Sequence, residues 1–465
     1  MSILEKLTTY LFETNYSSLP GEVIEATRKQ ILDTLGVAVA GSTCSIAREM
    51  LELADMVKKW GGKGESTILG FGGRAPAPEA AFINAISSTR LDYDDTLVSW
   101  INLHSSSVIV PVAFAMAERQ GNVSGPELIT AVTLGYDLAC RVKQACGRNS
   151  DNRIRFTCNF FGAAATAGKI LKLDHRQLQS ALFLAFHQMS GAGSDASGLR
   201  AGAALKGLSN GFAARAGIVS ALMAERGFPG ATDFLEPDNK ENYYALFCDG
   251  AYLPWLLTLD LGRTFAGTLA SQKEFPCCHG QHASLEATLG LVKENGLKAD
   301  DIAGVTLHLS PQDYALLADP VERKQNPQNI IETQFSLPWG VASALVYGEV
   351  GFRNFSAEAL ANQRIRNLAY KVFPQIDIAM SVEQGFPPAA VDIKTKNGKI
   401  YSRRVDSPFG TVDNPMNFDH ITAKFRECCR RSIRPIPEEN QAKVISLVKR
   451  LEKVKDTGHL ARLLG

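Results

Sequence analysis

The sequence contains no Cys-x-x-Cys pair, which excludes the usual pattern of a zinc ribbon or a thioredoxin-like redox motif. Its nine cysteines are an odd number spread over a long chain, and they include the adjacent pairs Cys277/Cys278 and Cys428/Cys429. This spacing is not that of a small disulfide-linked scaffold. We therefore expect the thiols to be reduced.

The sequence also lacks an excess of either charge and any long apolar run. Lys and Arg total 49 against 48 Asp and Glu, which argues against a general binder of polyanions. No apolar run reaches the roughly 18 residues that a membrane helix needs. Glu5 and Glu13 lie where a secretory signal would be apolar. We therefore expect a cytoplasmic protein with no nucleic-acid or membrane partner.

The first half of the 465-residue chain has the spacing of helices. Ile24, Ile31, Leu32 and Leu35 fall on one helical face that ends at Gly41. Alanine-rich stretches such as GAAATAGKI let helices approach closely and favour a packed helical domain. The further expected helices are 78–87, 108–119, 125–140, 162–171, 176–188 and 211–225.

The pattern changes after about Ala266. Alternating stretches at 305–310, 376–384 and 389–407 predict antiparallel strands, with a hairpin turn at Asn397-Gly398. Helical spacing occurs at 338–347 and 356–372 and returns from about Phe418. The predicted fold class is mainly α: a large all-helical domain (1–266 and 412–465) with an inserted, smaller α+β domain (267–411).

One acidic segment has the composition of a proton-transfer site. Asp92, Asp94, Asp95, Thr96 and His104 lie within 13 residues. Crowded carboxylates raise one another's pKa, and a carboxylate beside a histidine orients it as a base. Two alternatives stay open: the aspartates cap the following helix while His104 is a hydrogen-bonded polar residue, or the aspartates hold Ca²⁺ or Mg²⁺.

A glycine-rich segment, residues 190–217, carries Arg200, Lys206 and Arg215. Flexible backbone can turn its N–H groups toward an anion, and a nearby Lys adds charge, so a carboxylate or phosphate site is one interpretation. The other is that the glycines only permit close packing of helices.

A third segment, QKEFPCCHGQH, contains Lys273, Cys278, His279 and His282. Cys278 and His282 have the i, i+4 spacing of two metal ligands, although no third ligand is evident. A Cys–His nucleophilic pair and a simple turn with buried thiols are the alternatives.

Taken in order, these segments resemble the MmgE/PrpD family, which includes 2-methylcitrate dehydratase, cis-aconitate decarboxylase and iminodisuccinate epimerase. The resemblance covers nearly the whole chain. The matching stretches are Asn84, LDYDDT at 91–96, HSS at 104–106, KGLSNGFAARAG at 206–217, KEFPCC at 273–278 with His282, SLPWGVASALVYG at 336–348 and NPMNFDHITAKF at 414–425.

The resemblance implies a helical domain made from both chain ends, an α+β lid, a homodimer, and an active site between the domains. It implies no metal and no organic cofactor. It also implies roles for particular residues. The implied catalytic residues are His104, Asp92, Lys206, Lys273 and His282, and the implied substrate-binding residues are Thr96, Arg200, Lys206 and Lys273.

The chain departs from the family pattern at two places. The segment that carries a second active-site histidine in the decarboxylase reads IRFTCNFFG at 154–162, and no histidine occurs between His104 and His175. The histidine that often follows the first lysine is Ser209 here. These losses weaken the expectation of decarboxylation.

The expected activity is therefore that of a lyase or isomerase acting at a carbon alpha to a carboxylate of a small di- or tricarboxylate. Dehydration of a 2-methylcitrate-type substrate is the leading reaction. Epimerisation of an iminodisuccinate-like substrate comes second, because it needs no leaving group, and decarboxylation of cis-aconitate third. The rival classes are a non-catalytic ligand-binding homologue and a metal-dependent hydrolase.

Overall fold

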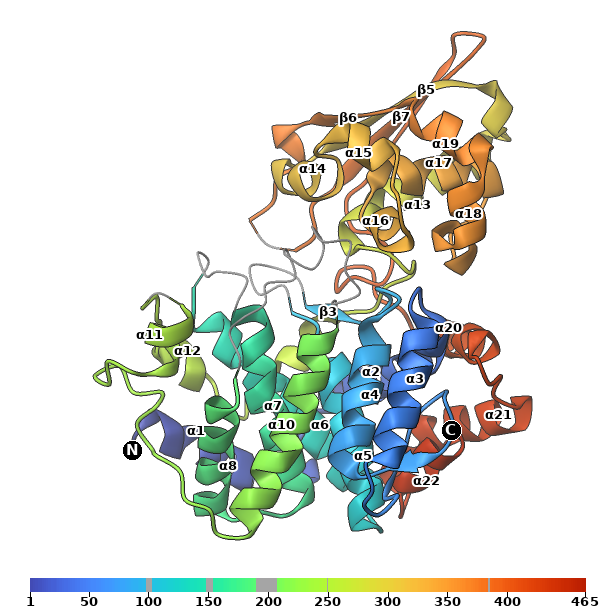
Figure 1. Ribbon diagram of the computed structural model, residues 1–465. Helices are drawn as coiled ribbons and strands as arrows, with labels where there is room; N and C mark the ends of the chain where they lie inside the picture. Colours follow the sequence, from blue (N-terminus) through green and yellow to red (C-terminus); the bar gives the residue numbers. More distant parts are fainter. Residues whose placement is uncertain (98–102, 148–153, 190–206, 249, 384) are drawn as a thin grey trace. The chain divides into compact units, whose positions relative to one another are not determined.

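The computed structural model describes residues 1–97, 103–147, 154–189, 207–248, 250–383 and 385–465 (Figure 1). The described residues form two compact units. Unit 1 is built from residues within 1–189, 207–270 and 417–465, and unit 2 from residues 271–416. Arg200 and Lys206 lie outside the described residues.

Unit 1 is helical. Its N-terminal helices are α1 (Ile3–Glu13), η1 (Tyr16–Ser18), α2 (Gly21–Ala40), η2 (Gly41–Thr43), α3 (Ala47–Lys59), α4 (Ala77–Thr89), α5 (Ser106–Gln120), α6 (Gly125–Gln144), α7 (Ile154–Ile170) and α8 (His175–His187). They are followed by α10 (Leu208–Glu225), α11 (Tyr243–Phe247), α12 (Trp255–Thr258), η3 (Ala266–Leu269), α20 (Phe418–Arg431), α21 (Glu438–Lys449), η8 (Leu451–Lys453) and α22 (Gly458–Arg462). Short strands are β1 (Ser66–Thr67), antiparallel to β2 (Arg74–Ala75), β3 (Thr96–Leu97), and β4 (Ala270–Ser271) at the boundary of the unit.

Small residues set how closely the central helices of unit 1 pack. A Cβ atom on Gly162 of α7 would lie 2.6 Å from the carbonyl oxygen of Gly135 in α6, closer than real Cβ atoms come. A Cβ atom on Gly217 of α10 would lie 2.7 Å from the backbone carbonyl carbon of Ala163 in α7. The expectation that the small residues of these stretches allow close approach is confirmed.

Helices from the two ends of the chain lie side by side in unit 1. In Figure 1 the N-terminal helix α2 runs beside α4, and the C-terminal helix α20 packs against α2. The contact is close because Gly36 of α2 has no side chain: a Cβ there would lie 3.2 Å from the Cα of Phe425. The C-terminal return therefore completes the helical unit.

No single described helix is long and apolar enough to cross a membrane. Gly21–Thr43 and Ala47–Lys59 meet that test only as a pair, bent by 105°. The second half of α2 is buried in unit 1.

Unit 2 is an α+β unit around a four-stranded mixed sheet in the order β6-β5-β7-β8, where β5 pairs parallel with β6 and antiparallel with β7. Its strands are β5 (Ile302–Leu309), β6 (Val372–Ile376), β7 (Ala389–Thr395) and β8 (Ile400–Val405). Its helices are η4 (His279–Gln281), α13 (His282–Asn295), η5 (Ala299–Asp301), α14 (Pro311–Leu317), α15 (Val321–Gln325), α16 (Ile330–Gln334), α17 (Leu337–Tyr347), η6 (Phe352–Phe355), α18 (Ala357–Ala361), α19 (Gln363–Ala369) and η7 (Ile378–Met380).

The predicted fold class, mainly α with a smaller α+β part, is confirmed, as is the hairpin at Asn397-Gly398 that joins β7 to β8. The prediction of an antiparallel strand at 376–384 is wrong. The strand β6 ends at Ile376, pairs parallel with β5, and is followed by the 3-10 turn η7. Asp377 starts that turn, because its side chain accepts a hydrogen bond from the backbone N–H of Ala379.

Candidate functional site

The acidic segment forms a buried loop between α4 and α5. Asp92 has a φ of 52°, in the left-handed region that Asp tolerates better than most residues, and its N–H donates to the carbonyl of Thr89. Farther on, the N–H and C=O groups of Leu97 and Leu103 bond each other at 2.8 and 3.1 Å. This bridge closes the loop and carries His104 back to the aspartates.

His104 is held by its Nδ1 atom, which lies 2.6 Å from the carbonyl oxygen of Asp95. A carbonyl oxygen only accepts hydrogen bonds, so Nδ1 carries the proton in this arrangement. The neutral ring then has its lone pair on Nε2, the tautomer that a general base requires. Oδ2 of the Asp94 carboxylate lies 3.7 Å from Nδ1, close enough to stabilise a positive charge on the ring.

The aspartates of the loop are almost wholly inaccessible to solvent, and Asp95 is 0% exposed. Oδ2 of Asp95 accepts a 2.9 Å hydrogen bond from the hydroxyl of Tyr136 in α6. Burial, and next the charge of Asp94, raises the pKa of Asp95 to about 7, even though the Tyr136 bond opposes the shift. The side chain of Asp95 therefore titrates in the neutral range, while its backbone carbonyl orients His104.

The aspartates do not cap α5. The N-cap of that helix is Ser105, and no side-chain hydrogen bond caps the helix. Ser105 instead donates to Oδ1 of Asn159 in α7 at 2.8 Å, and Ser107 donates to the carbonyl of His104 at 2.8 Å. The amide of Asn210 in α10 in turn donates to Ser107 at 2.9 Å. Side chains of α7 and α10 thus fix the backbone next to His104.

Asn159 and Asn210 were not singled out by the sequence analysis. Asn159 lies in the 154–162 segment, where the resemblance to the decarboxylase implied a second histidine, and here it accepts a hydrogen bond from Ser105. Asn210 lies in the KGLSNGFAARAG stretch, whose lysine drew attention. Both asparagines lie in segments that the resemblance had identified, but only the structure shows which atoms they bond.

A buried lysine from the far end of the chain supports the same loop. Lys424 of α20 has its Nζ 2.7 Å from Oδ1 of Asp33 in α2, and it donates to the carbonyl of Tyr93 at 2.9 Å. The same Nζ lies 3.9 Å from the centroid of the Tyr93 ring. Sequence reasoning missed this lysine, although NPMNFDHITAKF contains it. Lys424 fixes the loop backbone between Asp92 and Asp94.

The remaining predicted residues of this loop are also buried: Asp92 and Thr96 are each 2% exposed. Thr96 begins the strand β3 next to the bridge that returns the chain to His104. The structure thus brings Asp92, Thr96 and His104 together on one loop of unit 1, with two further carboxylates between them. Their roles toward a substrate stay predictions.

The glycine-rich segment is described only from Gly207 onward. Gly207 has a φ of 98° and precedes α10 as its N-cap. A Cβ on Gly211 would lie 2.7 Å from the Ile86 side chain of α4. For these glycines the structure supports close helix packing. The predicted roles of Arg200 and Lys206 fall outside the described residues.

The third segment lies in unit 2 and is tightly packed. Lys273 and His282 are each 1% exposed. The His282 ring lies 4.4 Å from that of His279 and 5.1 Å from that of Phe275, centroid to centroid. His279 is stacked at 3.6 Å on Phe386. Both imidazoles are therefore held between aromatic rings on the turn that leads into α13.

Two carboxyl groups of unit 2 have raised pKa values. Burial, and next the charge of Glu286, raises the pKa of Glu274 to about 7. Burial likewise raises the pKa of Asp313 to about 7, against a hydrogen bond from Ser310. Shifts of this kind gather at functional sites as well as in structural networks. Among the residues the structure describes, no three of the His, Cys, Asp and Glu side chains are grouped so as to hold a metal ion.

The comparisons with known proteins agree with the resemblance. The MmgE/PrpD N-terminal domain matches residues 5–255, and the MmgE/PrpD C-terminal domain matches residues 275–451. The chain therefore belongs to the MmgE/PrpD family, whose members act on small carboxylates.

Curated relatives align over nearly their whole length. The chain is 26% identical to a human cis-aconitate decarboxylase over 492 residues, covering 100% of the chain and 94% of the relative. It is 25% identical to a cis-aconitate decarboxylase-like protein of Aspergillus oryzae, covering 100% and 97%, and 25% identical to an Aspergillus terreus cis-aconitate decarboxylase, covering 96% and 92%.

Proposed function

We propose that this protein catalyses proton transfer at a carbon alpha to a carboxylate of a small di- or tricarboxylate, as a lyase or isomerase without a cofactor. The leading reaction is dehydration of a 2-methylcitrate-type substrate. The observation that carries the proposal is the 2.6 Å contact between Nδ1 of His104 and the Asp95 carbonyl, which leaves Nε2 as the basic atom.

The chemistry requires such a base. An α-proton next to a carboxylate is weakly acidic, so its removal needs a positioned base and nearby positive charge to stabilise the enolate-like product. His104 supplies the base, and Asp94 stabilises the imidazolium that results. Removing a general base of this kind typically lowers the rate by about 10²–10⁴-fold.

Positive charge comes, in this proposal, from Lys206, Lys273 and Arg200, which bind the substrate carboxylates. Thr96 donates a hydrogen bond to the substrate, and Asp92 polarises the proton-transfer group. His282 is the reserve acid or base. The family resemblance supports these assignments, and substitution of each residue tests its role.

Decarboxylation of cis-aconitate is a second candidate, favoured by the names of the curated relatives. Against it stands the absence of any histidine between His104 and His175. Epimerisation of an iminodisuccinate-like substrate is a third, because proton removal and return need no second acid for a leaving group.

One experiment separates these reactions: proton NMR of the purified protein in deuterated water with 2-methylcitrate, citrate, cis-aconitate and an aspartate-derived imine. Dehydration appears as a new vinylic product or methyl signal, epimerisation as exchange of the α-proton with retention of all carbons, and decarboxylation as loss of a carboxyl carbon. Absence of exchange, elimination and carbon dioxide release with every substrate would contradict the proposal and favour a non-catalytic ligand-binding homologue.

We also propose a homodimer, as the family resemblance implies, and a cytoplasmic location, as the charged residues Glu5 and Glu13 near the start of the sequence suggest. Sedimentation equilibrium of the full chain tests the oligomeric state, since a monomer of 50.4 kDa and a dimer differ twofold in mass. A monomer at micromolar concentration would contradict the dimer.

A further inference from the structure

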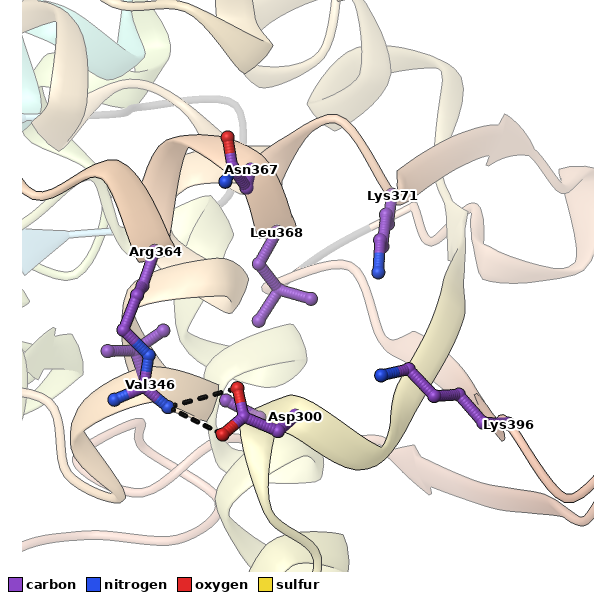
Figure 2. A pocket seen from close by; sticks show the side chains of 8 residues that line it. Asp300, Val346, Arg364, Asn367, Leu368, Lys371 and Lys396 are labelled. Carbon is purple, nitrogen blue, oxygen red and sulfur yellow. Dashed lines mark hydrogen bonds and ion pairs between the residues drawn. The ribbon is translucent and has the colours of Figure 1, made fainter.

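Unit 2 has a surface pocket of about 140 Å³ at one end of its sheet (Figure 2). Its charged and amide-bearing lining residues are Asp300, Arg364, Asn367, Lys371 and Lys396. Of the residues in the proposed reaction, none of those that the structure describes lines it. It therefore calls for an explanation of its own.

The topology of the sheet places two lysines around this pocket. Lys371 immediately precedes β6, and Lys396 immediately follows β7, the two strands that flank β5. Since β6 is parallel and β7 antiparallel to β5, the start of β6 and the end of β7 lie at the same end of the sheet. Strands two places apart in a sheet are about 10 Å apart, a span that two lysine side chains readily bridge from either side.

Backbone hydrogen bonds fix both lysines at that end of the sheet. The N–H of Lys396 donates to the carbonyl of Asp301 at 2.8 Å, and the carbonyl of Lys371 accepts from Val305 of β5 at 2.9 Å. The Lys371 ammonium group also lies 3.4 Å from the carbonyl of Ile302, a long contact that satisfies at most one of its three donors. The flexible part of each lysine is thus only its side chain.

The pocket carries excess positive charge. Arg364 is matched by Asp300, because one guanidinium nitrogen lies 3.1 and 3.2 Å from the two carboxylate oxygens. Within the described part of the chain, neither Lys371 nor Lys396 has a carboxylate partner at ion-pair distance. Figure 2 shows their side chains ending on one side of the pocket, with the Asp300–Arg364 pair on the other. The ammonium groups of Lys371 and Lys396 can therefore both bind an anion in the pocket.

We propose that this pocket binds a small oxyanion carrying two or more negative charges, held by Lys371 and Lys396 with Arg364 at the rim. Charge-assisted hydrogen bonds from ammonium groups are the strong contacts for phosphate or carboxylate oxygens. The exposed Asn367 amide adds neutral donors, which suit an oxyanion too. This site does not depend on the proposed reaction.

Isothermal titration of the full chain at low salt tests the proposal, with pyrophosphate and tricarballylate as separate probes of phosphate and carboxylate chemistry. The variants are Lys371→Met, Lys396→Met and the double variant. Each single substitution removes one charge and is expected to weaken binding about tenfold, and the double variant more strongly. Lys394→Met is the matched control, because Lys394 lies two residues from Lys396 and outside the pocket.

Saturable binding of either probe with this dependence on Lys371 and Lys396 supports the site, and the tighter probe identifies its chemistry. Lys273→Met separates the pocket from the proposed substrate site: the part of the binding that depends on Lys371 and Lys396 belongs to the pocket, and any tricarballylate binding that Lys273→Met removes belongs to the substrate site. Equal affinity in the wild type and the double variant, or no saturable binding of either probe, would overturn the proposal. Circular dichroism of each variant confirms that the fold is retained.

Discussion

The ammonium nitrogen of Lys424 lies 2.7 Å from a carboxylate oxygen of Asp33, and both side chains are buried. These residues are 391 positions apart in the sequence, on α20 and α2. The same nitrogen donates to the Tyr93 carbonyl in the loop that holds His104. A structural ion pair between the two chain ends therefore also positions the candidate catalytic loop.

Replacement of Lys424 by Met is expected to destabilise the protein strongly. The variant leaves the Asp33 carboxylate buried without its cation, and breaking one partner of a buried pair typically costs about 3–5 kcal/mol. Urea unfolding, followed by circular dichroism, measures the free energy of unfolding. Lys449→Met is the matched control, because its ion pair with Asp419 is exposed and should be worth at most about 1 kcal/mol.

The double variant Asp33→Leu with Lys424→Met distinguishes charge from packing. If the cost comes from an uncompensated buried charge, removing both charges should restore much of the lost stability. A double variant as unstable as the sum of its two single variants would show that packing of the side chains, rather than charge, dominates.

Stability should depend on pH through Asp95. The folded-state pKa of Asp95 is raised to about 7 from 3.8, so between these values the folded protein binds a proton that the unfolded chain has lost. Stability from this group is therefore fully present near pH 4 and declines by up to about 4 kcal/mol as the pH rises through 7.

The variant Asp95→Asn should remove the part of the decline that Asp95 causes and leave the part due to Glu274 and Asp313, since its side-chain oxygen still accepts from Tyr136 but does not ionise. The measurement is the free energy of unfolding at pH 5 and pH 7.5 for both proteins. Asp238→Asn, at an exposed position, is the control and should keep the wild-type difference. Equal differences in wild type and Asp95→Asn would show that Asp95 does not titrate in this range.

Close packing of α10 on α7 predicts that Gly217→Val is destabilising. Its Cβ would meet the backbone of Ala163, and overpacking of this kind typically costs about 1–3 kcal/mol or more. Gly21→Ala, at the start of α2, meets nothing within 4 Å and should be neutral or slightly stabilising. Similar melting temperatures for the two variants would argue against the described packing.

Local patterns predicted most helices well because their signals are local. The helical spacing at 338–347 corresponds to α17, and the alternation around Asn397-Gly398 to the β7–β8 hairpin. The strand β6 was missed because it is an edge strand: only Val372 and Pro374 of its five residues are buried, and a proline in the middle weakens a strand signal. Only pairing with β5 shows it.

The candidate site was predictable in part. The composition of one loop identifies Asp92, Thr96 and His104, and the structure places them together. The sequence of the loop does not reveal that His104 is held by a backbone carbonyl, since any residue at position 95 offers that atom. The sequence also does not reveal that Asn159 and Lys424 support the loop, because their partners are 54 and 331 residues away. Such contacts depend on helix packing, which local patterns do not encode.

The most direct test of the account is the rate of α-proton exchange, followed by proton NMR in deuterated water, for His104→Gln beside the wild type, with the substrate that the polycarboxylate panel identifies. We predict a fall of about 10²-fold or more with the circular dichroism spectrum unchanged, while His459→Gln, at an exposed position, exchanges like the wild type. A correctly folded His104→Gln protein that exchanges the proton at the wild-type rate would contradict the assignment of His104 as the base.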